Sequence, residues 1–183
     1  MALTYSKGMA LGTSAPAFSL PGIDDRQHSL ESYAKANVLV VVFTCNHCPY
    51  AKACEGRLIA IQKDYAAKGV QLVAINPNNA AAYPDDSFDH MKLRAKEKGF
   101  NFPYLHDESQ EVARAYDAAC TPDVFVFDAD RKLTYNGRID DNWQEESNVT
   151  RRDLRAAIDA TLAKTSLPFE AIASMGCSIK WKK

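Results

Sequence analysis

Two cysteines separated by two residues follow directly after an apolar run. The run, 38–43, consists of β-branched and aromatic residues with one leucine, which predicts a strand buried on both faces. Cys45 and Cys48 come next, and from Pro49 onward most residues favour a helix. Because unpaired N–H groups and the helix dipole stabilise an anion at a helix N-terminus, we expect Cys45 to be an exposed thiolate with a lowered pKa. This arrangement predicts attack on disulfides.

Cys48 and His47 complete the predicted chemistry. Positions three apart share a helix face, so Cys48 is placed to attack a mixed disulfide formed by Cys45 and to release the partner reduced. A protonated His47 would put positive charge beside the Cys45 thiolate, stabilise the reduced form and make the disulfide more oxidising. A solvated His47 without this role is the alternative. We therefore predict Cys45, Cys48 and His47 as the catalytic residues.

Other uses of a cysteine pair fit this sequence less well. A zinc site needs four ligands, but the chain has no second C-x-x-C, and His28, His90 and His106 are scattered. A structural disulfide is typical of exported chains, and the first residues contain no apolar signal segment. We expect no resident metal and no cofactor.

Length and charge narrow the class of protein. A chain of 183 residues is predicted to form one domain over 1–183, with a C-terminal tail from about residue 166. The formal net charge of −1 gives no reason to expect nucleic acid or a membrane surface as a partner. No apolar run approaches the length of a transmembrane helix. We expect a cytoplasmic protein, whose thiols stay mostly reduced.

The pattern of apolar runs and turn residues predicts the elements around the pair. A strand at 70–75 follows the helix after Pro49, which gives a βαβ unit with parallel strands and a right-handed crossover. The loop 76–86 then leaves the carboxyl end of that strand, where α/β sheets place their sites. The remaining elements are short strands near residues 18–20 and 27–28, helices at 87–98, 109–117 and 150–164, and a hairpin of 123–128 with 133–138.

This order of elements resembles the thioredoxin fold, with the cysteine pair after the first central strand and Thr121-Pro122 before the hairpin. Gly12-x-x-Ala15-Pro16-x-Phe18-x-Leu20 resembles the opening of redoxins of the AhpC/TSA-like and TlpA-like branch. The segments 45–50 and 176–181 resemble a bacterial family described as thiol-disulfide isomerase/thioredoxin. The resemblance implies an α/β protein: a thioredoxin-like three-layer α/β/α sandwich with a mixed central sheet and an N-terminal β-hairpin extension.

The resemblance also implies roles for single residues. Cys45 would be the nucleophile and Cys48 the resolving thiol. Pro122 would be a cis-proline facing the pair, and Thr121 would bind a substrate chain as an added strand. From the sequence alone, a trans-proline that starts an edge strand fits Pro122 equally well. The implied partners are a disulfide-containing protein or small molecule and an unidentified electron donor or acceptor.

Four positions depart from the related families. Asn46-His47 stands between the cysteines where typical thioredoxins carry Gly-Pro. Leu39 stands where thioredoxins place a buried Asp, so proton transfer to or from the second cysteine needs water or another base. Val42 stands where peroxiredoxins place a Thr three residues before their reactive cysteine, which disfavours peroxide reduction.

The other three cysteines have different predicted roles. Cys54 is expected in the core. Cys120 lies two residues before Pro122, so the fold would bring it near the pair, either as an accessory thiol or as a small apolar residue. Cys177 lies in the closing segment of the resembled family. We hypothesise that it is a third redox thiol that exchanges with the pair; the alternative is a small residue that lets Trp181 pack.

Two classes of function therefore stand. The first is a thiol-disulfide oxidoreductase with antioxidant activity, in which the pair exchanges with protein or small disulfide substrates. The second is a binding module whose thiols capture a soft metal such as Cu(I), with Cys177 as a third ligand. A peroxiredoxin-like peroxidase is a weaker third. The loop 138–143 is expected to border the site, with Trp143 either a recognition aromatic or a cover over the last helix.

Overall fold

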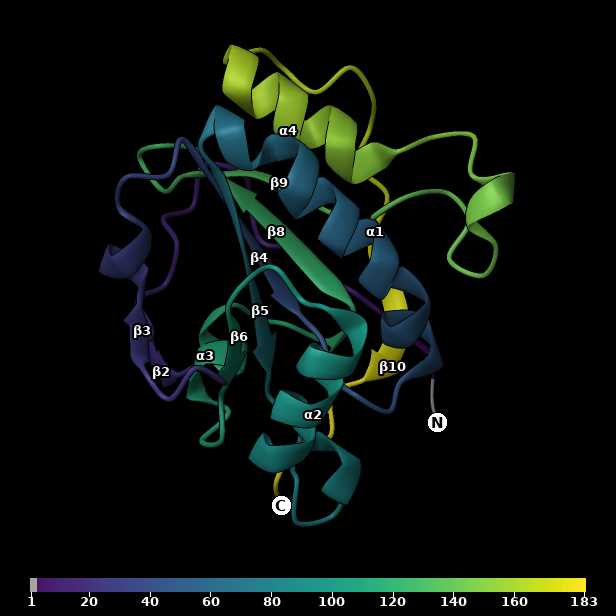
Figure 1. Cartoon of the computed structure of the whole chain (residues 1–183). Helices are drawn as coiled ribbons and strands as arrows, with labels where there is room; N and C mark the ends of the chain where they lie inside the picture. The colour runs from purple at the N-terminus through teal and green to yellow at the C-terminus, as the bar shows by residue number, and fades with distance from the viewer. Residues whose placement is uncertain (1–2) are drawn as a thin grey trace.

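A mixed sheet forms the centre of the computed structural model, which describes residues 3–183 (Figure 1). The central strand β4 (Val38–Phe43) is fully buried, as its apolar run predicts. It pairs in parallel with β5 (Val70–Asn76) and antiparallel with β8 (Asp123–Phe127), so the predicted mixed sheet is confirmed. The order across the sheet is β6 (Tyr104–His106), β5, β4, β8 and β9 (Leu133–Asn136).

Helices cover both faces of this sheet. Alternate residues of β4 face opposite ways, so Val40 packs toward one helical layer and Val41 toward the other. The first layer holds α1 (Pro49–Tyr65), α2 (Phe88–Lys98) and α4 (Asp153–Ala163). The second holds α3 (Glu111–Ala115), the 3-10 turn Leu30–Tyr33 and the hairpin of β2 (Ser19–Pro21) with β3 (Gln27–Ser29). The predicted three-layer sandwich and N-terminal hairpin are confirmed.

Backbone geometry sets the ends of the helices. The 3-10 turn Ala66–Lys68 follows α1 and ends at Gly69. The left-handed φ of 79° at this position favours glycine over residues with a Cβ atom. The predicted helix at 109–117 is only α3, because Gln110 has a left-handed φ of 67° and interrupts its start. The predicted helix at 150–164 begins at Asp153, since Arg152 is not helical. None of the helices within residues 3–183 combines the length and apolar composition needed to cross a membrane.

A second, smaller sheet was not predicted. It consists of β1 (Leu3–Tyr5), β10 (Met175–Ser178) and β7 (Cys120–Thr121), in that order. In β10, Cys177 lies opposite Leu3 on one side and Thr121 on the other, and both pairings are antiparallel. The C-terminal tail thus returns to the centre of the molecule, where β10 lies beside the start of α1 (Figure 1).

Candidate active site

Both cysteines of the pair are reduced and buried. The exposed fraction is 2% for Cys45 and 0% for Cys48. Cys45 lies in the loop between β4 and α1, and Cys48 is the N-cap of α1 because the helix begins only at Pro49. The prediction that Cys45 is exposed at the helix start is therefore wrong. Together with Ala51, the two cysteines pack against Cys177 of β10.

Thr121 contacts both sulfurs. Its Oγ1 lies 3.3 Å from Cys45 Sγ, and its carbonyl oxygen lies 3.2 Å from Cys48 Sγ. The Thr121–Pro122 peptide bond is cis, as the resemblance implies, so the trans alternative is wrong. The fold thus brings together the cysteine pair, Thr121 and Pro122, all of which were predicted as site residues.

The environment of Cys48 favours its thiolate. The Cys45 thiol is the strongest of its hydrogen-bonding partners, followed by the thiol of Cys177 and the backbone N–H groups of Ala51 and Cys177. The Thr121 carbonyl opposes this, because Cys48 can donate to it only while protonated. Four donors outweigh one acceptor and the cost of burial, and the pKa of Cys48 is lowered to about 4.

The environment of Cys45 favours its neutral thiol. Its hydrogen bond to Cys48 is the largest effect; burial and the negative charge of Asp86 add to it, and together they raise the pKa of Cys45 well above its ordinary value. The hydroxyl of Thr121 offsets a part of this. The hydrogen bond that Cys45 shares with Cys48, together with burial, thus opposes the predicted lowering of the Cys45 pKa.

His47 lies beside Cys45 and is held by an acid that sequence reasoning missed. His47 Nδ1 lies 2.5 Å from Asp86 Oδ2, and the imidazole stacks on Tyr83 with ring centroids 5.1 Å apart. The other ring nitrogen, Nε2, is buried without a hydrogen-bond partner among residues 3–183. The predicted proximity is confirmed, but Asp86 counters the positive charge that a protonated His47 would bring to Cys45.

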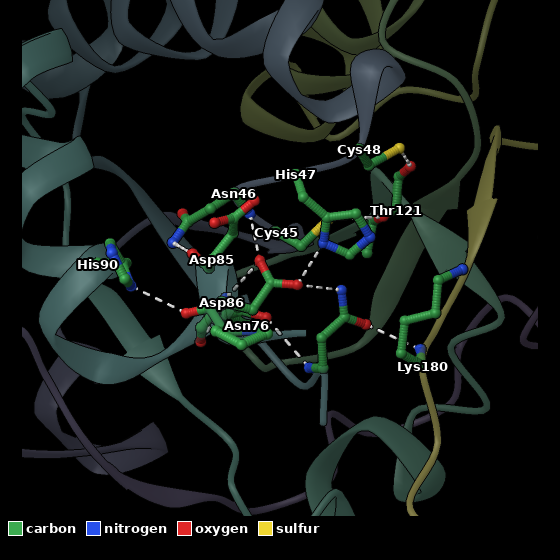
Figure 2. A network of polar contacts seen from close by, with 12 residues as sticks. Cys45, Asn46, His47, Cys48, Asn76, Asp85, Asp86, His90, Thr121 and Lys180 are labelled. Carbon is green, nitrogen blue, oxygen red and sulfur yellow. Dashed lines mark hydrogen bonds and ion pairs between the residues drawn. The ribbon is translucent and has the colours of Figure 1, made fainter. Parts of the chain in front are cut away.

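Asp86 is the centre of a buried polar network (Figure 2). Its carboxylate accepts from the Asn46 N–H at 2.6 Å, from Asn78 Nδ2 at 2.8 Å and from Asn76 Nδ2 at 3.4 Å. Asn78 Oδ1 in turn accepts the Lys180 N–H at 2.9 Å. The network therefore connects the loop between the cysteines with the tail after β10.

The Asn46 side chain, between the two cysteines, joins its loop to the segment 76–86 and to β6. Its Nδ2 donates to the Asp85 carbonyl at 2.7 Å, and its Oδ1 accepts from the Tyr104 hydroxyl at 3.0 Å. The segment 76–86 was expected near the site, since it leaves the carboxyl end of β5. This expectation is confirmed, and the position of the loop was the available signal for Asp86.

Comparison with known proteins places the chain in a family. Residues 11–136 match the AhpC/TSA family. The chain belongs to the AhpC/TSA family. An uncharacterized conserved protein from Geobacillus kaustophilus, known from a crystal structure, has 46% sequence identity to this chain. The two structures superpose with a TM-score of 0.95, and the match covers 100% of this chain and 97% of that one.

Two further proteins that are similar to this AhpC/TSA protein carry names that refer to thiol–disulfide chemistry. The thiol-disulfide oxidoreductase ResA of Geobacillus thermodenitrificans is 25% identical over 132 residues, which cover 71% of this chain and 70% of the relative. A thiol:disulfide interchange protein of the thioredoxin family from Chlorobium tepidum TLS shares the fold, with 21% identity and a TM-score of 0.65 over 85% of this chain and 99% of that one. The predicted redoxin relationship and thioredoxin-like fold are confirmed.

The Cu(I) hypothesis needs a set of sulfur ligands. Among residues 3–183, the potential metal ligands found within 4.8 Å of one another are one atom each of Cys45, His47 and Asp86. Cu(I) prefers thiolates, whereas this group supplies one sulfur, one nitrogen and one oxygen. Cys177 is not a member of the group, and the Asp86 carboxylate already accepts several hydrogen bonds. The three sulfur ligands of the hypothesis are therefore not all gathered within this distance of one another.

The remaining predicted residues lie around the pair. Cys54 is buried in the core between α1 and the sheet, as expected. Cys120 is buried in β7, where its sulfur contacts the Pro122 carbonyl at 3.5 Å. Trp143 packs on Tyr50 with ring centroids 4.0 Å apart, at the start of α1 rather than over the last helix. It also lines a cavity of about 210 Å³ that borders Pro122.

Proposed function

We propose that this AhpC/TSA protein is a thiol-disulfide oxidoreductase whose Cys45–Cys48 pair cycles between dithiol and disulfide. The observation that carries the proposal is the contact of both sulfurs with Thr121 beside a cis-proline, with one sulfur stabilised as a thiolate. The thiolate is the species that attacks disulfides. The substrates would be protein or small-molecule disulfides, met in the cytoplasm.

The electrostatics support attack by Cys48 first. A substrate strand paired with Thr121 would take the position of β10 and bring its own sulfur to Cys48. The Cys48 thiolate forms a bond to one substrate sulfur, and the other leaves with the electron pair. Cys45 then attacks the Cys48 sulfur, and the released substrate thiolate takes the Cys45 proton. This order is the reverse of the one that the resemblance implies.

A stabilised thiolate also bears on the direction of redox flow. Stabilising the reduced form raises the reduction potential of the pair. We therefore propose a potential nearer the roughly −180 to −120 mV of isomerases and strong oxidants than the roughly −270 mV of thioredoxin. Equilibration with glutathione redox buffers measures this value.

Single-cysteine variants test the proposal. Cys45→Ser and Cys48→Ser are each mixed with glutathione disulfide or insulin, and mixed disulfides are trapped by acid and alkylation. We expect Cys45→Ser to accumulate the mixed disulfide and Cys48→Ser to accumulate little. The opposite pattern would overturn the order of attack. A wild-type protein that exchanges with neither disulfide would overturn the function, and consumption of hydrogen peroxide alone would favour the peroxidase.

A further inference from the structure

The strand β10 pairs with β7 at the Thr121 edge, where the proposed function places a substrate strand. In its register, Cys177 lies opposite Thr121 and Ser178 lies opposite Cys120. The other side of β10 pairs with β1, so the strand lies inside a small sheet. Cys177 is 3% exposed, and the chain beyond it is held by Asn78, which accepts the Lys180 N–H. An intramolecular strand thus has the position expected of a bound substrate chain.

Gly176 shows how closely this strand approaches the site. A Cβ atom at this position would lie 2.0 Å from the Thr121 carbonyl oxygen and 3.2 Å from the Pro122 nitrogen. Real Cβ atoms do not approach backbone this closely, so the register of β10 depends on glycine here. The residue that follows, Cys177, is thereby placed over the cysteine pair.

The three sulfurs are arranged with Cys48 in the middle. The Cys48 sulfur has side-chain hydrogen bonds with both Cys45 and Cys177, and it also accepts the backbone N–H of Cys177. The Cys45 thiol forms hydrogen bonds with Cys48 and Thr121, and the Cys177 thiol forms a hydrogen bond with Cys48. Cys48 is therefore the sulfur through which we expect exchange to reach Cys177.

We propose that Cys177 is a third catalytic thiol, which forms a disulfide with Cys48 after the pair has been oxidised. This inference rests on the proposed function, because a disulfide substrate supplies the oxidation that creates the Cys45–Cys48 bond. The Cys177 sulfur attacks Cys48, the Cys48–Cys177 bond forms and the Cys45–Cys48 bond breaks. Cys45 leaves with the electron pair and takes the proton lost by Cys177, so the exchange itself oxidises nothing further.

The product of this step differs from an ordinary oxidised pair. The Cys48–Cys177 bond fastens β10 covalently over the substrate edge, while Cys45 returns to a thiol. The next substrate chain can enter only after a reductant has opened this bond and β10 has left Thr121. The tail is therefore both an internal substrate and the cover of the site.

Disulfide mapping tests the step directly. The protein is oxidised with a small excess of glutathione disulfide, alkylated under acid conditions and digested with trypsin. Cys45 and Cys48 fall on the peptide 36–52 and Cys177 on 165–180, so a linked pair of peptides reports the bond. We expect this link in the wild type and its loss in Cys48→Ser and Cys177→Ser. Cys45→Ser cannot form the Cys45–Cys48 bond and should keep glutathione on Cys48 instead.

Cys120→Ser is the matched control, because Cys120 is buried on the neighbouring strand, one register position away. It should keep the link. Absence of the link from the wild type would overturn the inference, and so would a link that survives in Cys48→Ser. Exchange with glutathione disulfide, measured on the same samples, separates this failure from failure of the proposed function.

A second variant tests the cover without removing a thiol. Gly176→Ala places a Cβ atom against the Thr121 carbonyl. Overpacking of this size should raise the equilibrium constant for release of the tail by roughly one to two powers of ten. We expect alkylation of Cys45 and Cys48 to accelerate about tenfold or more, and the Cys48–Cys177 link to fall. Gly56→Ala is the control, since its Cβ meets nothing within 4 Å. Equal alkylation rates in both variants would overturn the covering role.

Discussion

Cys45 and Cys48 carry the same functional group, and their neighbours make them different. Cys48 is the N-cap of α1 and accepts two backbone N–H groups, whereas Cys45 precedes the helix and lies near the Asp86 carboxylate. The hydrogen bond between the two thiols is the largest effect on both groups: it raises the pKa of Cys45 and lowers that of Cys48. The spacing of the cysteines identifies the pair, and the groups around each sulfur set its pKa.

The ionisation of Cys48 can be measured by the ultraviolet absorbance of its thiolate. Because the pKa of Cys48 is lowered to about 4, the reduced wild type should show one thiolate at pH 6 that disappears as the pH falls through about 4. Burial raises the pKa of Cys54 and Cys177 to about 12, so these thiols stay protonated and contribute no thiolate absorbance at pH 6.

Cys48→Ser should abolish the signal at pH 6, whereas Cys45→Ser should keep most of it, because a serine hydroxyl can donate to Cys48 in place of the Cys45 thiol and the backbone donors remain. A thiolate signal that persists in Cys48→Ser would contradict the assignment. Cys177→Ala should move the midpoint to a higher pH, since it removes one donor to Cys48.

Asp86 gives a second prediction for a single side chain. The carboxylate is buried and bound to His47 and three amide groups, so Asp86→Asn should lower the free energy of unfolding by about 3 kcal/mol. Asp85→Asn is the control, because the Asp85 side chain is exposed and only its carbonyl takes part in the network. Urea unfolding of both variants checks this, and equal losses would show that the buried network contributes little.

At the scale of elements, buried periodic segments were predictable and the tail was not. The run 38–43 predicted β4, and Gly69 and Gly99 predicted the ends of two helical segments. The strand β10 contains glycine and serine and has four residues, so only its partners β1 and β7 make it a strand.

Pro49 was the missed signal in the candidate site. Proline is favoured at the first position of a helix, so it places Cys48, rather than Cys45, at the cap. The roles of Thr121 and Pro122 came from the family resemblance, because composition alone leaves the isomer of a proline undetermined.

An ion pair attaches α1 to the loop that borders the site. Arg57 and Asp140 are both buried, and the Arg57 guanidinium also donates to the carbonyls of Asn142 and Trp143. Asp140→Asn leaves a buried cation without its counter-charge and should cost about 3 kcal/mol. Asp117→Asn removes an exposed pair with Lys7 and should cost less than about 1 kcal/mol. Thermal or urea unfolding compares the two, and equal costs would contradict the argument.

At the scale of the whole molecule, the reduced protein keeps its thiols away from solvent. All five cysteines are reduced and buried, although three of them are proposed to take part in the reaction. Reaction with a thiol reagent should therefore be limited by opening of the structure, and only full denaturation should expose five thiols at once. We expect low urea concentrations to accelerate labelling of the native protein. Immediate labelling without urea would show that the tail is usually displaced.

The close approach of Gly176 to Thr121 also sets a rule for molecules outside the chain. A peptide that docks in the register of β10 must carry glycine immediately before its cysteine, because any larger residue would collide with the Thr121 carbonyl. Disulfide partners would then be sorted by the residue next to their cysteine, before any chemistry occurs. The tail sequence Met-Gly-Cys-Ser is the first competitor peptide to synthesise, and its Met-Ala-Cys-Ser counterpart should compete poorly.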